Sequence, residues 1–185
     1  IYLQGKRVTF KNIGQALEAG VALVPEERRK QGILPNTSIL ANISLCNLPA
    51  LSHMGIIDKK KEQAYAEHCS SMLNVACSSV HQHVGNLSGG NQQKVILARE
   101  LEGHPDLLVA VHPTRGLDIG ATRFVHDTMI EAREKGCGVL LISADFDEIL
   151  EVSDRIVVMF EGQVMGVFSG KEPPIQEISL AMAGK

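Results

Sequence analysis

The chain has 185 residues, a length that fits one domain, or one domain with a small lobe, and excludes two full enzyme domains. Its 44% hydrophobic and 21% charged residues exclude a chain that is disordered throughout. Lysine and arginine number 18 against 21 acidic residues and are scattered, so no nucleic-acid partner is expected, and the basic runs 28–30 and 59–61 are interpreted as solvated surface.

No apolar run approaches the roughly 18 residues that span a bilayer. The four cysteines form no CxxC pair, which indicates reduced thiols and a cytosolic location. The chain does not begin with Met, and we expect it to be a piece of a longer protein.

Short runs rich in valine, isoleucine and leucine predict buried strands at 21–24, 107–111, 139–142 and 155–160. These runs alternate with longer helical patterns, which is typical of an α/β fold whose parallel sheet is flanked by helices. Glu161-Gly162 separates the last run from an apolar run at 163–168, so a C-terminal β-hairpin is predicted.

Residues 38–76 carry no strand signal, and apolar residues recur at helical spacing after Asp58, which is interpreted as a helix N-cap. We therefore expect a helical subdomain at 38–85 and an α/β core formed by 1–37 and 86–185. Met54, Met72 and Met129 fall on helical patterns and are interpreted as core residues.

The segment Leu87-Ser88-Gly89-Gly90-Asn91-Gln92 opens an apolar-periodic helix. Free backbone N–H groups at a helix start, with two glycines that leave the backbone accessible, are typical of a phosphate site. The alternative is an ordinary capped helix start, and Ser-Gly-Gly alone favours it.

Two further segments favour the phosphate site over the ordinary capped helix start. One is the predicted strand 107–111 with His112 after it, and the other is Gly116-Leu117-Asp118, which precedes another predicted helix. In this order and spacing the three segments resemble the signature, Walker B and D-loop motifs of the ATP-binding cassette (ABC) ATPases. The segment 24–32 is similar to the Q-loop of the sugar and nucleoside importer branch, and the resemblance covers about residues 5–170.

The chain departs from the family pattern at several positions. No GxxxxGK[ST] phosphate loop (Walker A) occurs in it. Val111 stands where the family places the Asp that supports Mg²⁺, and His112 stands where it places the Glu that polarises water. Ala144 replaces the switch histidine, and Glu26 takes the place of the Q-loop glutamine, where its carboxylate would orient a metal-bound water. We therefore expect no catalytic residues and no turnover by the chain alone.

The resemblance implies a composite site for ATP and Mg²⁺ that a second ABC nucleotide-binding domain completes. Its residues in this chain are Ser88, Gly89, Gly90, Gln92, Glu26 and Asp118. The first three would contact a γ-phosphate bound by the partner, Gln92 would support the loop, and Asp118 would reach across the interface. Asp118 is equally well explained as a helix N-cap. Transmembrane permease subunits are the other implied partners, and they would place the chain at the inner face of the cell membrane.

Three functions are weighed. The first is the degenerate second nucleotide-binding domain of a sugar or nucleoside importer. The second is an interaction module that docks on a permease or sister ATPase without binding nucleotide. A DNA-repair or translation ATPase of the same superfamily is disfavoured by the segments 26–28 and 113–116.

A metal cluster of His53, His68, His81 and His83 is disfavoured because the residues lack ligand spacing. Because a sheet that lacks its Walker A strand and helix exposes backbone and apolar groups, we expect self-association of the chain or a filling of the gap by residues 1–10.

Overall fold

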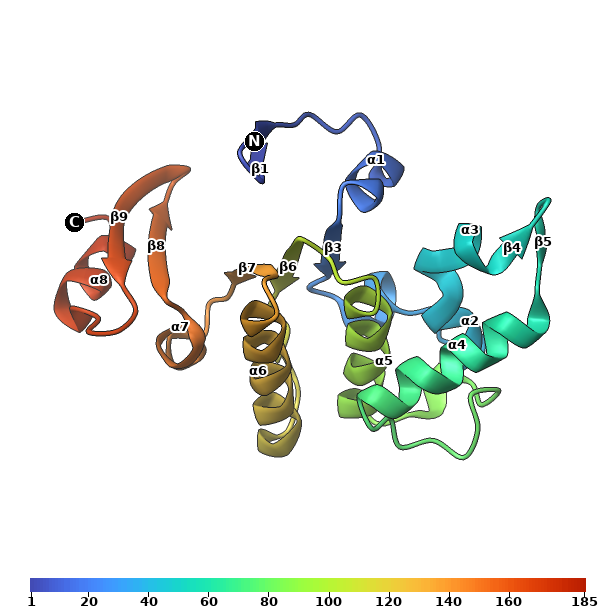
Figure 1. The fold of residues 1–185 in the computed structure, drawn as a ribbon. Coiled ribbons are helices and arrows are strands. Elements are labelled where there is room, and N and C mark those ends of the chain that lie inside the picture. The colour runs from blue at the N-terminus through green and yellow to red at the C-terminus, as the bar shows by residue number, and fades with distance from the viewer. The chain divides into compact units, whose positions relative to one another are not determined.

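The computed structural model describes all residues, 1–185, as two compact units, residues 1–142 and residues 143–185 (Figure 1). This division differs from the boundaries at 37 and 85 expected from the sequence, which remain a prediction. The helices and strands of the first unit are β1 (Tyr2–Leu3), β2 (Lys6–Arg7), α1 (Ile13–Glu18), β3 (Val21–Val24), α2 (Ile39–Ser44), α3 (Leu48–Leu51), β4 (Ser52–His53), β5 (Ile56–Ile57), α4 (Lys59–Met72), α5 (Gly89–Leu101), β6 (Leu107–Val111), α6 (Ile119–Glu134) and β7 (Gly138–Ile142).

The main sheet of the first unit contains three parallel strands in the order β3-β6-β7. The predicted strands 21–24 and 107–111 are confirmed at both ends, and the strand predicted at 139–142 begins one residue earlier. The helices α5 and α6 lie in the crossovers that join these strands (Figure 1). Parallel strands require such crossovers, which explains the alternation of strand and helix patterns in the sequence.

One face of this sheet forms the core with the helices. The helix α5 packs against β3, α6 packs against β7, and the two helices contact each other. The strand residues Ala22, Val24, Leu108 and Ala110 are buried on this face. Cys137, just before β7, is buried as well, as expected for a small core residue.

Within the first unit, the opposite face of the sheet is partly exposed. Leu23 pairs with Val109 and Val109 with Leu140, so the three side chains form one row across the strands. Leu23 and Leu140 are each 50% exposed and Ile142 is 46% exposed. The strands are therefore apolar on both faces of the sheet, but α5 and α6 cover only one of them.

Residues 38–85 are mostly helical, as expected, and also contain one short strand pair that the sequence did not signal. β4 and β5 form a two-residue antiparallel ladder around the turn Met54-Gly55, where Met54 has φ +50° and Gly55 φ +79°. Met54 is therefore 90% exposed, and Met72, at the end of α4, is 45% exposed. Of the three methionines expected in the core, only Met129 is buried.

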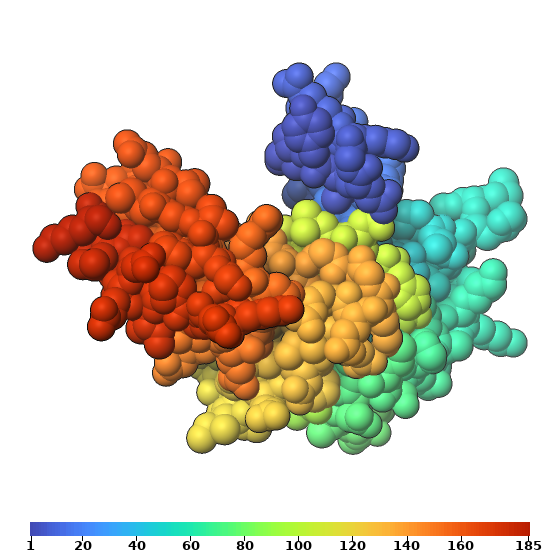
Figure 2. Space-filling view, turned by 60° about the vertical axis from the view of Figure 1, so that its left-hand side comes forward, coloured from blue at the N-terminus to red at the C-terminus, as the bar shows by residue number.

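The N-terminal residues do not complete the main sheet. β1 pairs only with β2, and Ile1 and Tyr2 are 81% and 73% exposed. Figure 2 shows this segment in dark blue at the molecular surface. The proposed filling of a gap beside β6 is wrong because β6 already has a neighbour on each side, β3 and β7.

The second unit contains the predicted C-terminal hairpin. Its elements are α7 (Phe146–Val152), β8 (Arg155–Phe160), β9 (Gln163–Ser169) and α8 (Ile175–Met182). β8 and β9 pair antiparallel with a register shift between Val158 and Met159. The small core of the second unit consists of Ile156, Val158, Ile178 and Ala181. Across both units, no helix combines the length and apolar content that crossing a membrane requires.

Candidate functional site

Three segments distant in the sequence meet near the carboxyl ends of β3 and β6. The segment 24–32 follows β3, the segment 111–118 follows β6, and the third is the start of α5. Arg28 and Leu117, from the first two segments, lie close to Gly89 at the start of α5, and Ala121 of α6 lies close to Gly90. Carboxyl ends of parallel strands lie at the same edge of a sheet, and in open α/β folds this edge commonly binds ligands.

Ser88 is the N-cap of α5. Its Oγ accepts a hydrogen bond from the Asn91 backbone N–H at 3.4 Å and another from Asn91 Nδ2 at 3.0 Å. The side chain is exposed, and the first amides of the helix, those of Gly89 and Gly90, lack intrahelical acceptors. The capped-helix interpretation is thus correct, and the same geometry leaves N–H groups for an anion.

Both glycines allow a close approach, to the flexible end of a side chain at Gly89 and to a Cβ of α6 at Gly90. A Cβ on Gly90 would lie 2.9 Å from Ala121 Cβ, and a Cβ on Gly89 would lie 2.9 Å from Arg28 Nη2. Glycine therefore allows α6 and Arg28 to approach the start of α5.

Gln92 holds the loop that precedes the helix. Its side chain is 1% exposed, and Nε2 donates to the carbonyl oxygens of Leu87 at 3.1 Å and of Val84 and Gly85 at 3.4 Å. Gln92 therefore fixes the backbone entering Ser88 and does not point to solvent. Its predicted support of the loop has a clear geometric basis here.

Arg28 is a site residue that the sequence interpretation missed. It lies in the π-helical turn Arg28–Gly32, is half-buried, and its Nε is buried without a hydrogen-bond partner. Desolvation, and then the neighbouring Arg29, lower the pKa of Arg28. The assignment of run 28–30 to solvated surface is therefore wrong for Arg28, whose contact with Gly89 no local pattern could show.

Glu26 is engaged in an ion pair. Arg115 Nη1 donates to Glu26 Oε1 at 2.6 Å, which joins the segment after β3 to the segment after β6. Residues 26–30 and Arg115 line an open hollow of about 260 Å³. In this arrangement the Glu26 carboxylate neutralises a guanidinium, which competes with the predicted role in orienting a metal-bound water.

The other positions singled out in the sequence lie at the end of β6, at the start of α6 and after β7. Val111 ends β6, and His112 follows with φ +45° while its N–H donates to the Ile142 carbonyl oxygen at 2.8 Å. Asp118 is the N-cap of α6 and accepts from the Ala121 N–H at 2.9 Å. Ala144 lies between β7 and α7, in the second unit.

These residues fit a phosphate better than a metal ion. The helix start, two glycines and the Arg28 guanidinium offer donors and positive charge to an anion. Mg²⁺ requires oxygen ligands, whereas Val111 has none and Glu26 pairs with Arg115. No group of three or more potential metal-ligating side chains occurs in the structure.

Comparison with curated proteins gives relatives over nearly the whole chain. The ribose import ATP-binding protein of Lactococcus lactis subsp. cremoris is 40% identical over an alignment of 186 positions, which covers 100% of this chain and 38% of the relative. A nucleoside import ATP-binding protein from the same subspecies is 39% identical over 100% of this chain and 37% of its own length. A xylose import ATP-binding protein of Photobacterium profundum is 39% identical over 90% of this chain and 33% of the relative.

The chain is homologous to the ABC ATP-binding proteins of sugar and nucleoside import. The predicted resemblance is confirmed, and the chain spans a little over a third of the length of these relatives. No family model matches it.

Solved ABC structures confirm the predicted fold class. A nucleotide-free ATP-binding cassette from an ABC transporter aligns with a TM-score of 0.75 at 23% identity, over 98% of this chain and 72% of that chain. A dimeric cassette in a post-hydrolysis state, bound to ADP and Pi, aligns with a TM-score of 0.74 at 19% identity, over 92% and 73%. At these identities the likeness concerns the ABC fold alone.

Proposed function

We propose that this chain is part of the ATP-binding subunit of an ABC importer for sugars or nucleosides. In this role it contributes the signature segment to an ATP site that a second nucleotide-binding domain completes. The relatives named for ribose, nucleoside and xylose import support the transporter class.

The observation that carries this proposal is the start of α5. Ser88 caps the helix, Gly89 and Gly90 keep it accessible, and Arg28 lies against Gly89. A phosphate held by another domain would meet backbone N–H groups and a guanidinium at this point. Gln92 would maintain the loop, and Asp118 would reach across the interface while capping α6.

The chain's own catalytic positions are proposed to be degenerate. Val111 and His112 replace the two Walker B carboxylates, Ala144 replaces the switch histidine, and no phosphate loop occurs. The partner domain would therefore hold Mg²⁺ and the nucleotide. Bound Mg²⁺-ATP supplies the phosphoanhydride whose cleavage drives transport.

The remaining parts of the proposal concern assembly. Residues 38–85 would act as a helical subdomain beside a core of 1–37 and 86–185 and would meet transmembrane permease subunits. Through these subunits the chain would lie in the cytoplasm, peripheral to the cell membrane.

The test is retention of labelled ATP by a mixture of this chain with an ABC domain that has an intact phosphate loop. We expect the mixture to retain more ATP than the partner alone and Gly89→Asp to abolish the increase. An aspartate at this position is compatible with a helix start but places a carboxylate beside Arg28.

Gly103→Asp is the matched control, because a side chain at Gly103 meets nothing within 4 Å. Complex formation without added ATP retention would overturn the proposal in favour of an interaction module that binds no nucleotide. Equal ATP retention by the mixture that contains the Gly89→Asp variant would show that the signature segment does not contact the nucleotide.

A further inference from the structure

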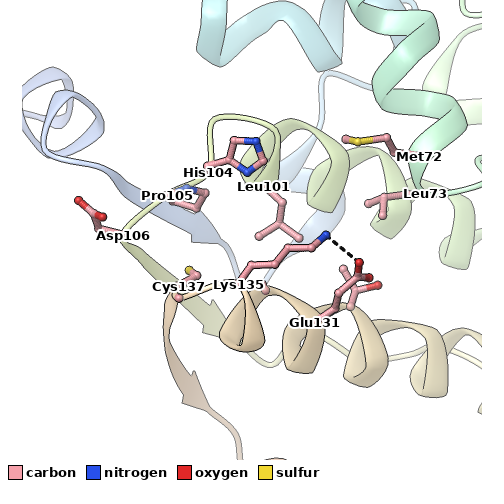
Figure 3. A pocket seen from close by; sticks show the side chains of 12 residues that line it. Met72, Leu73, Leu101, His104, Pro105, Asp106, Glu131, Lys135 and Cys137 are labelled. Atoms are coloured by element: carbon pink, nitrogen blue, oxygen red, sulfur yellow. Dashed lines mark hydrogen bonds and ion pairs between the residues drawn. The ribbon is translucent and has the colours of Figure 1, made fainter.

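A second cavity lies within the first unit, away from the signature segment (Figure 3). Its volume is about 330 Å³, and it is lined by the ends of α4, α5 and α6 and the turns that follow α5 and α6. A cavity of about 150 Å³ is enough to bind benzene. The space therefore accommodates an aromatic ring that carries a short side chain.

The cavity has an apolar floor and an open mouth. Leu73, Leu101, Ala132 and Cys137 provide apolar wall, and a Cβ built on Gly136 would meet nothing within 4 Å. Desolvation raises the pKa of Cys137, so the thiol stays neutral. An apolar ligand body would gain by leaving water here.

The charges around the cavity favour a cation. Met72 is the last residue of α4, Leu101 the last of α5, and Lys135 follows the last of α6, so three helix C-termini carry partial negative charge toward this region. The carboxylate of Glu131 lies at the cavity, whereas that of Asp106, another lining residue, points away from it in Figure 3. The basic side chains that line the cavity are Lys135 and His104.

Lys135 is held by a weak interaction. Figure 3 shows its side chain extended toward Glu131, and Nζ lies 2.7 Å from Glu131 Oε1. Both side chains are more than 60% exposed, so this i,i+4 pair contributes little stability. A ligand ammonium can replace Nζ on the carboxylate while Lys135 moves into solvent.

We propose that this cavity binds a small amphipathic cation, an aromatic or branched aliphatic body with one ammonium group. The body occupies the floor formed by Leu73, Leu101 and Ala132, and the ammonium pairs with Glu131. This site is independent of the proposed ATP role, because none of its residues belongs to the signature segment.

The test is NMR titration of the full chain with three probes of similar size: 2-phenylethylammonium, 2-phenylethanol and 3-phenylpropionate. We expect shifts confined to residues 72–73, 101–106 and 128–137, with the ammonium probe binding at least about threefold more tightly than either other probe. Glu131→Gln should lower ammonium affinity about threefold, as for an exposed ion pair, and leave 2-phenylethanol unchanged.

Two variants complete the test. Glu134→Gln removes a neighbouring charge on α6 that does not line the cavity and should leave all three affinities unchanged. Ala132→Leu should fill the floor and abolish binding of every probe. Equal or tighter binding of 3-phenylpropionate, full ammonium affinity in Glu131→Gln, or no local shifts with any probe would each overturn the proposal.

Discussion

Arg115 Nη1 and Glu26 Oε1 lie 2.6 Å apart and connect the segment after β3 to the segment after β6. Their side chains are 66% and 45% exposed, so solvent screens the pair. The ion pair therefore positions the two segments and adds little to global stability.

A double-mutant cycle with Glu26→Gln and Arg115→Gln should give a coupling energy of about 0.2–1 kcal/mol from urea unfolding. The exposed pair of Lys135 and Glu131 serves as the matched comparison and should give a similar value. A coupling energy above about 2 kcal/mol would show that the pair is structural and not merely positional.

Gly90→Ala tests the approach of α6 to the signature segment. The added methyl group would lie 2.9 Å from Ala121 Cβ, so we expect a loss of about 1–2 kcal/mol in unfolding free energy despite the better helix propensity of alanine. Ala121→Gly in the same chain should recover part of this loss. Gly103→Ala, with no contact within 4 Å, should stay within about 0.5 kcal/mol of the parent. A neutral Gly90→Ala variant would contradict the close approach.

Stability should fall at alkaline pH because of Cys69. Desolvation, followed by the charge of Glu102, raises the pKa of this thiol from 9.0 to about 12. Between these values the unfolded chain loses the proton and the folded chain keeps it, so stability present below pH 9 is lost as the pH rises, by up to about 1.4 kcal/mol per pH unit.

Urea unfolding at about pH 8 and about pH 10.5 measures this loss. It should be smaller in Cys69→Ala and unchanged in Val95→Ala, which also opens a buried site but removes no titrating group. An identical pH dependence in the parent and Cys69→Ala would contradict the assignment.

Incubation of the purified chain with Mg²⁺-ATP should release no phosphate above the blank. The chain has no phosphate loop, and Val111 and His112 provide no Walker B carboxylate. Installing Val111→Asp and His112→Glu together should not restore turnover, since nothing positions the nucleotide. Sustained phosphate release by the parent chain would refute this prediction.

The partly exposed face of the main sheet should drive self-association of the isolated chain. Leu23 and Leu140 are exposed on either side of the partly buried Val109, in one apolar row that the first unit alone leaves in water. Light scattering should give a mass above 20.0 kDa that falls on dilution and falls further in Leu140→Lys. Ile56→Lys, at an exposed apolar site on β5, should not change the mass. A mass of 20.0 kDa at every concentration would exclude association through this face.

The local pattern alone determined the main strands and the starts of three helices. The apolar runs predicted both ends of β6 and of β8 correctly. The capping residues Asp58, Ser88 and Asp118 indicated where α4, α5 and α6 begin. Such signals are readable because hydrophobic period and capping act over a few neighbouring residues. The two-residue strands β4 and β5 were missed because so short a ladder has no period to detect.

Only the tertiary structure decided how these elements meet. It placed Arg28 against Gly89, paired Glu26 with Arg115, and set β7 on the far side of β6 from β3. It also brought the ends of α4, α5 and α6 around one cavity. Contacts of this kind join residues far apart in the chain and depend on packing and strand order, which leave no trace in local composition.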